Sequence, residues 1–224
     1  MQAWIDHIGA DVFAFVASAL LIAVYYAFLW TRARRDPHYT IHGVNVTART
    51  LWVHDVMAHR NKDVMAVQTL RNYVMAASFM ASTSVLLILG TLTLSTQAES
   101  LAQTWHAVNI GGSTTPQAWI IKVMCLLTTF IVAFFAFTMT IRLLNHVVFM
   151  INVPEGDAHV GLNPRHVAHR LARAGHYYSV GTRAFFVAIP LVFWLFGPLY
   201  LLLATIGLVI TLHQVERTPR VEGP

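Results

Sequence analysis

The chain has 224 residues, of which 56% are hydrophobic and only 11% are charged, and its formal net charge is +5. About a quarter of the residues of a typical soluble domain are charged, and a soluble domain of this length exposes too much surface to be covered by so few. The composition therefore excludes an ordinary soluble domain, a disordered chain and, with one cysteine, a disulfide-stapled secreted domain. It leaves a polytopic membrane protein.

Four segments are long and apolar enough to cross a bilayer core of about 30 Å, which takes about 20 helical residues. They are residues 12–30, 73–94, 118–141 and 184–212. We therefore predict an all-α integral membrane bundle of four transmembrane helices, forming one membrane domain over 1–224. Lys122 is the only charged residue inside these segments, and we expect it to extend to the nearby interface. The last segment is long and contains Pro190 and Pro198, which predicts a kink, a tilt or entry through an interfacial segment.

The distribution of Lys and Arg between the segments predicts their orientation. None precedes the first segment, seven lie in 31–72, none in 95–117, five in 142–183 and two in the tail. Because cytoplasmic loops carry the excess of basic residues, we place loops 31–72 and 142–183 in the cytoplasm and both termini outside.

Both cytoplasmic loops have patterns typical of additional cytoplasmic or interfacial helices. Asn45 suits the start of a helix that ends near His59, and Asn61 suits the start of one that continues into the second span. In the second loop, Asn163 followed by proline predicts a helix start, and Gly175 is a candidate for its end.

Polar side chains gather at the predicted cytoplasmic ends of the spans. These candidates are Gln68, Arg71 and Asn72 before the second span, Arg142, Asn145 and His146 after the third, and Arg183 before the fourth. Converging arginines bind phosphate or carboxylate groups bidentately, so the set predicts a site for an anion or a lipid headgroup, or the mouth of an anion pathway. The alternative is that these residues only anchor the helix ends at the interface.

Histidines form a second set of candidates, here for a metal ion. His166 and His169 would share one helix face, with His176 two turns further on. On the outer side His7, Asp11, His106 and His213 are candidates for another cluster. The alternative is solvated or interfacial histidine; the sequence requires no cofactor, and a bound metal stays open.

Several segments resemble a known family. They are Val67-Gln68-Thr69-Leu70-Arg71-Asn72, then Ile141-Arg142 with Asn145-His146, and Gly181-Thr182-Arg183 followed by Phe196-Gly197-Pro198. Their order and spacing resemble the membrane-protein family called domain of unknown function 599, over roughly residues 10–214. The resemblance implies a four-pass membrane protein of bacteria or plants and no particular activity.

Three classes of function are compatible with these observations. The first, which we favour, is an oligomeric channel or transporter for a small solute or ion in the bacterial inner membrane. The second is an accessory or assembly subunit of a larger membrane complex. The third is a metal-dependent or lipid-modifying enzyme, which is the least supported because no nucleophile elbow, phosphate loop or dinucleotide fingerprint is present. Nucleic acid is not an expected partner, since the chain has no extended basic stretch.

Overall fold

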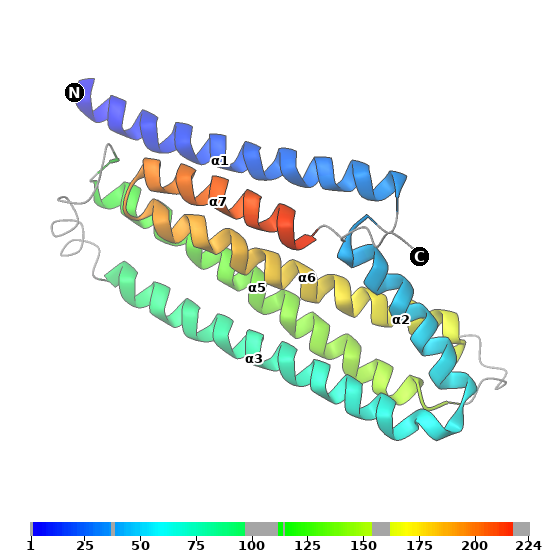
Figure 1. Ribbon diagram of the computed structural model, residues 1–224. Helices are drawn as coiled ribbons and strands as arrows, with labels where there is room; N and C mark the ends of the chain where they lie inside the picture. Colours follow the sequence, from blue (N-terminus) through cyan, green and yellow to red (C-terminus); the bar gives the residue numbers. More distant parts are fainter. Residues whose placement is uncertain (1, 37–38, 97–111, 114, 154–161, 217–224) are drawn as a thin grey trace. The chain divides into compact units, whose positions relative to one another are not determined.

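The computed structural model describes residues 2–36, 39–96, 112–113, 115–153 and 162–216 (Figure 1). The described residues form long α-helices joined by turns. The helices are α1 (Gln2–Arg35), α2 (Ile41–Ala58), α3 (Asp63–Thr96), α5 (Pro116–Met150), α6 (Pro164–Trp194) and α7 (Pro198–Glu216), with a 3₁₀ turn at Arg60–Lys62.

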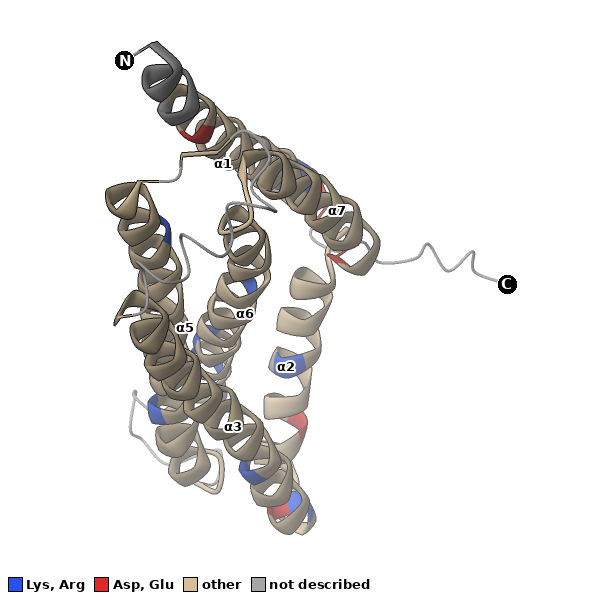
Figure 2. Ribbon diagram, turned by 90° about the vertical axis from the view of Figure 1, so that its left-hand side faces the viewer, with Lys and Arg blue, Asp and Glu red and all other residues tan. Residues whose placement is uncertain are grey.

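Four of these helices are long and apolar enough to cross a membrane: α1 from Gly9 onward, α3, α5 and α7. Large apolar side chains stay exposed along them, such as Phe13, Phe79, Phe135 and Leu203, as expected of helices that face lipid. Figure 2 shows long stretches of α3, α5 and α7 without a charged residue. The predicted all-α membrane bundle is confirmed.

The chain divides into two compact units. Unit 1 comprises residues 1–41, 86–131 and 184–224, and unit 2 comprises residues 42–85 and 132–183. Helices α3, α5 and α6 contribute residues to both units. Helices α1 and α7 belong to unit 1, and α2 belongs to unit 2 except for its first residue, Ile41.

Unit 2 has an apolar core built by α2 and by parts of α3, α5 and α6. Its largest fully buried side chains include Val53, Leu70, Leu144, Val147 and Val167. Within each helix the buried residues of this core recur at the three- and four-residue spacing that places side chains on one helix face, as Ala66 and Leu70 do in α3 and Leu144, Val147 and Ile151 do in α5. Additional helices in both predicted loops are therefore confirmed.

The boundaries of these helices differ in part from the prediction. Helix α2 begins at Ile41, so Asn45 lies inside it, and α3 begins at Asp63 after the 3₁₀ turn. As predicted, α3 continues without a break into the second span. Asn163 also caps α6 as predicted, because its side-chain oxygen accepts a hydrogen bond from the backbone N–H of Arg165 at 3.0 Å.

The expectation that Gly175 ends its helix is wrong, since α6 continues through it to Trp194. The space beside Gly175 is taken by the side chain of Arg49, and a Cβ at Gly175 would lie 1.9 Å from Arg49 Nη1. Gly175 therefore allows a side chain from another helix to approach closely, and it does not end its own helix.

The predicted last span, 184–212, is divided in two. Helix α6 ends at Trp194, Gly197 has a φ of 141°, and α7 begins at Pro198. A positive φ of this kind suits glycine, and proline suits the first position of a helix because that position needs no N–H donor. Pro190 stays within α6. The two prolines thus have different roles, and a chain reversal replaces the predicted kink.

Within unit 1, α7 runs back along the end of α6 and parallel to α1 (Figure 1). Leu201 near the start of α7 packs with Ala14, whereas Leu208 and Leu212 further along pack with Tyr25. Tyr25 also donates a hydrogen bond to Glu216 near the end of α7, at 3.3 Å. The start of α1 and the end of α7 therefore lie at opposite ends of unit 1. The prediction that both termini lie outside counted the divided segment as a single crossing and stays a prediction.

Candidate functional site

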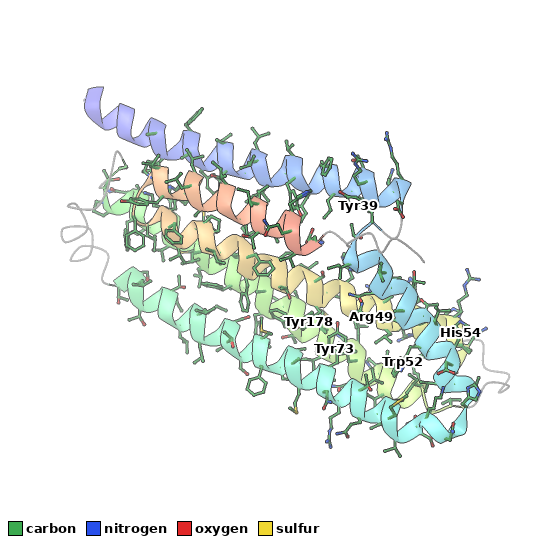
Figure 3. The ribbon with its side chains drawn as sticks, in the orientation of Figure 1. Tyr39, Arg49, Trp52, His54, Tyr73 and Tyr178 are labelled. Atoms are coloured by element: carbon green, nitrogen blue, oxygen red, sulfur yellow. The ribbon has the colours of Figure 1, made fainter. Side chains whose placement is uncertain are left out.

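Arg49 of α2 is partly buried in unit 2, between α3 and α6. Its Nη2 donates a hydrogen bond to the hydroxyl of Tyr73 on α3 at 3.5 Å, and its guanidinium lies 5.8 Å from the centre of that ring. Its Nη1 is buried beside Gly175 of α6 and has no hydrogen-bond partner among the described residues. Figure 3 shows Arg49 directed toward Tyr73 and Tyr178. Because leaving a buried charged donor unpaired costs several kcal/mol, this atom marks a place for an acceptor.

Basic side chains surround the same region. The ring of His42, at the start of α2, lies 6.0 Å from the ring of His176 on α6. Burial lowers the pKa of His42 below its ordinary value, and the positive charges of Arg183, His176 and Arg49 lower it further. All the charges that act on His42 are therefore basic, and we call His42, Arg49, His176 and Arg183 the basic cluster.

Aromatic rings form one wall of this region. Tyr178 of α6 packs edge-on against Tyr73 at 5.3 Å and against Phe137 of α5 at 5.5 Å. Phe137 fits over Gly181, where a Cβ would lie 2.7 Å from the ring. These contacts fix the spacing of α3, α5 and α6. The hydroxyl of Tyr73, which accepts the hydrogen bond from Arg49, therefore has a defined position.

The carboxylates described in unit 2 are Asp55 and Asp63. Asp55 is ion-paired to Lys62 and lies 3.3 Å from His59. The hydrogen bond from Lys62 lowers the pKa of Asp55. The Asp55 carboxylate is thus engaged at the α2–α3 turn, away from the basic cluster, whose positive charges suit an anion.

Six of the seven residues predicted at the span ends lie elsewhere. Ala66 and Leu70 of α3, with Leu144 and Val147 of α5, point into the core of unit 2. The residues on the other faces of these helices are exposed: Gln68, Arg71, Asn72, Arg142, Asn145 and His146. No hydrogen bond or ion pair joins them to the rest of the described chain. Arg183 alone belongs to the basic cluster.

The histidines predicted as metal ligands form no cluster in the part of the chain that the structure describes, where three or more His, Cys, Asp or Glu residues do not gather. His166, His169, His176 and His213 are all exposed, and His176 also belongs to the basic cluster. His106 and the side chain of His7 lie outside the described residues.

Asp11 is engaged in a buried ion pair in unit 1. One carboxylate oxygen lies 2.9 Å from Lys122 Nζ and accepts a hydrogen bond from the indole N–H of Trp194 at 2.9 Å, and the other accepts one from the backbone N–H of Ser113 at 2.8 Å. The side chain of Lys122 is 3% exposed. The expectation that Lys122 extends to the interface is therefore wrong, because a carboxylate lies beside it.

Sequence reasoning missed Arg49, His42 and Tyr73, which come from segments far apart in the chain. Arg49 was counted only as a basic loop residue. The available clue was Gly175 in the middle of a helical pattern, since a glycine there often marks a close approach.

Comparison with known proteins identifies the family of the chain. No curated protein and no solved structure matches this chain. A family model described as "Protein of unknown function, DUF599" matches residues 13–221, which is nearly the whole chain. The chain belongs to this family of proteins.

Proposed function

We propose that this protein is a channel or transporter for a small anion, which binds at the basic cluster of unit 2. The observation that carries the proposal is the guanidinium of Arg49, which has one buried nitrogen that no described residue hydrogen-bonds. A phosphate or carboxylate oxygen is the acceptor that a guanidinium binds best. His42 and His176 are close enough to each other to contact the same small anion.

The direction of the helices in unit 1 supports five crossings of the membrane, by α1, α3, α5, α6 and α7. The amino terminus is then outside and the carboxyl terminus inside. Trp119 and Val123 of α5 pack against Leu195, and Phe130 packs against Phe185, so α5 and α6 are antiparallel. Helix α7 then turns back to the side where α1 ends. In this arrangement the tail, with its two arginines, joins the cytoplasmic segments, and every Lys and Arg except Lys122 and Arg183 is cytoplasmic or at the inner end of a crossing helix.

The position of Arg183 along α6 supports a role in passage of the anion. Arg183 precedes Trp194 by eleven residues, which is about 17 Å along a helix axis. This distance is about half of a bilayer core. Ionisable side chains at such a depth usually line substrate or ion pathways.

Binding of named anions to the purified protein tests the proposal. The protein in detergent is titrated calorimetrically with inorganic phosphate, with succinate and with choline as a cationic control. We expect phosphate or succinate to bind and Arg49→Gln to weaken that binding about tenfold to hundredfold, since a charge-assisted hydrogen bond contributes about 1.5–3 kcal/mol. Arg142→Gln, which changes an exposed arginine, is the matched control and should bind normally.

Flux through liposomes separates transport from binding alone. Liposomes that contain the protein are loaded with radiolabelled phosphate or succinate, and its release is measured. Release that requires Arg49 supports a channel or transporter, whereas binding without release would replace this proposal with an anion-regulated subunit. Absence of binding by every anion tested would refute it.

A second candidate function, association with further subunits, is supported by the exposed polar faces of α3 and α5. Gln68, Arg71 and Asn72 share one helix face, as do Arg142, Asn145 and His146. Amide side chains at the membrane interface hydrogen-bond well between neighbouring helices. Mass measurement of the protein extracted in mild detergent tests for a homo-oligomer or a mixed complex, and Asn72→Leu with Asn145→Leu should dissociate it; a monomer would exclude this candidate.

A further inference from the structure

Unit 1 contains a cavity of about 450 Å³ between α1, α5, α6 and α7. Its lining is apolar except for a few hydroxyl groups and one thiol. The residues include Ile22 of α1, Cys125 of α5, Pro190 and Leu191 of α6, and Leu201 of α7. This volume falls within the range of pockets that bind small organic molecules.

Ser18 is the polar group in this cavity that lacks a partner. It is 4% exposed, and its hydroxyl has no hydrogen-bond partner among the described residues. The other hydroxyl side chains, Thr128, Thr129 and Thr205, each donate to the backbone carbonyl four residues earlier. Ser18 therefore holds the one hydroxyl proton of the lining that is still available for a ligand.

The rim of the cavity faces the surroundings of the bundle. Phe15, Ala19 and Ala23 of α1 and Thr128 of α5 line the cavity and are exposed. Because α1 and α5 are both apolar enough to span the membrane, an opening between them faces hydrocarbon. A ligand enters such an opening from the bilayer, so it must itself be soluble in the bilayer.

We propose that this cavity binds an apolar, membrane-dissolved molecule that carries a carbonyl oxygen, which accepts a hydrogen bond from Ser18. The apolar lining favours a ligand whose main part is apolar, and the available Ser18 hydroxyl proton favours a ligand that carries a hydrogen-bond acceptor. Two sources supply this chemistry: the acyl ester of a bilayer lipid and an isoprenoid quinone. The cavity lies in unit 1 and shares no residue with the basic cluster.

Photolabelling of the full-length protein in lipid nanodiscs tests this proposal. The probe is an alkyl palmitate with a diazirine in its chain, and the labelled peptides are identified by mass spectrometry. We expect adducts on the faces of α1 and α5 that line the cavity. Three competitors are added in turn: unlabelled alkyl palmitate, a decyl-substituted benzoquinone, and hexadecane, which has the apolar body but no carbonyl.

Two variants assign the interaction to the cavity. Ser18→Ala should weaken competition by the carbonyl compounds about threefold to tenfold, as expected for one hydrogen bond, and leave hexadecane unchanged. Ala23→Phe should remove the labelling by filling the rim. Ser84→Ala is the matched control, since Ser84 is fully buried, lies outside the cavity and already donates to the Met80 carbonyl.

The outcomes separate the two sources and can overturn the proposal. Preferential competition by the quinone assigns the cavity to a quinone, and preferential competition by the ester assigns it to a lipid. Labelling spread evenly over all exposed helices, or hexadecane competing as well as both carbonyl compounds, would overturn it. Neither result affects the anion proposal, which is measured on other residues with water-soluble ligands.

Discussion

Lys122 Nζ lies 2.9 Å from a carboxylate oxygen of Asp11, and both side chains are almost completely buried in unit 1. The indole of Trp194 donates to the same carboxylate and packs under the ammonium group, 5.4 Å from ring centre to Nζ. One buried pair thus connects the starts of α1 and α5 to the end of α6. In an apolar surrounding each charge is tolerated because the other is present.

Removal of the carboxylate should therefore destabilise the protein strongly. We expect Asp11→Ala to lower the free energy of unfolding by about 3–5 kcal/mol, since it leaves Lys122 buried without a partner. Thermal unfolding in detergent, followed by circular dichroism, measures the effect. The double variant Asp11→Asn with Lys122→Met should recover most of the loss because it buries no charge. Equal destabilisation by the single and double variants would contradict the role of the pair.

The close approach at Gly175 predicts a loss of anion binding. Gly175→Ala places a methyl group where Arg49 Nη1 lies, so the guanidinium must move away from Tyr73. We expect binding of phosphate or succinate to weaken at least as much as in Arg49→Gln. Gly207→Ala is the matched control, because Gly207 is also helical and a Cβ there meets nothing within 4 Å. Undiminished binding by Gly175→Ala would show that this position of Arg49 is not required.

The lowered pKa of His42 predicts that anion binding depends on pH. Without an anion, burial and the neighbouring positive charges keep His42 neutral below the pH at which histidine ordinarily titrates. A bound anion favours the protonated ring, so binding takes up a proton and affinity should increase as pH falls from 7.5 to 5.5. His42→Gln should flatten this dependence when affinity is measured by calorimetry at each pH. An affinity that increases with pH would contradict the proposed role.

The same shift affects stability without a ligand. The unfolded state binds the His42 proton at a higher pH than the folded state, so this group makes folding less favourable as pH falls below about 6.5. The melting temperature of the ligand-free protein should therefore decrease from pH 7 to pH 5.5, and it should decrease less in His42→Gln. An identical pH profile for both proteins would refute the assignment.

The parallel arrangement of α1 and α7 predicts opposite locations for the two ends of the chain. Cysteines are introduced singly at Gln2 and at Gly223 in a Cys125→Ala background, and intact cells are treated with a membrane-impermeant maleimide. We expect labelling at position 2 without permeabilisation and at position 223 only after it. Labelling of both positions in intact cells would restore the prediction of four crossings.

Local patterns in the sequence were sufficient for much of the fold. The continuous α3 followed from the absence of any helix-breaking residue between Asp63 and Tyr73, and the start of α6 followed from Asn163 and the proline after it. Helix capping and the length of an apolar segment depend only on residues that are neighbours in the chain, so both can be predicted from the sequence.

The divided last helix shows where local reasoning was insufficient. Pro190 and Pro198 both remove an N–H donor, yet one stays inside α6 and the other begins α7. The difference lies in Gly197, whose positive φ allows the chain to reverse. Whether a glycine adopts that conformation depends on what the reversed helix then packs against, here Ala14 and Tyr25 of α1.

The sequence by itself determined that this protein is an all-α membrane protein, because the length, apolarity and charge content of a segment decide whether it can cross a bilayer. Only the tertiary structure decided which polar residues meet. Arg71 and Arg142 have the same character in the sequence as Arg49 and Arg183, but the first two lie on exposed helix faces and the last two act on the same histidine. The reason is physical: the rotation of each helix about its axis is set by the side chains of other helices, and Gly175 admits Arg49 only because α2 packs beside it.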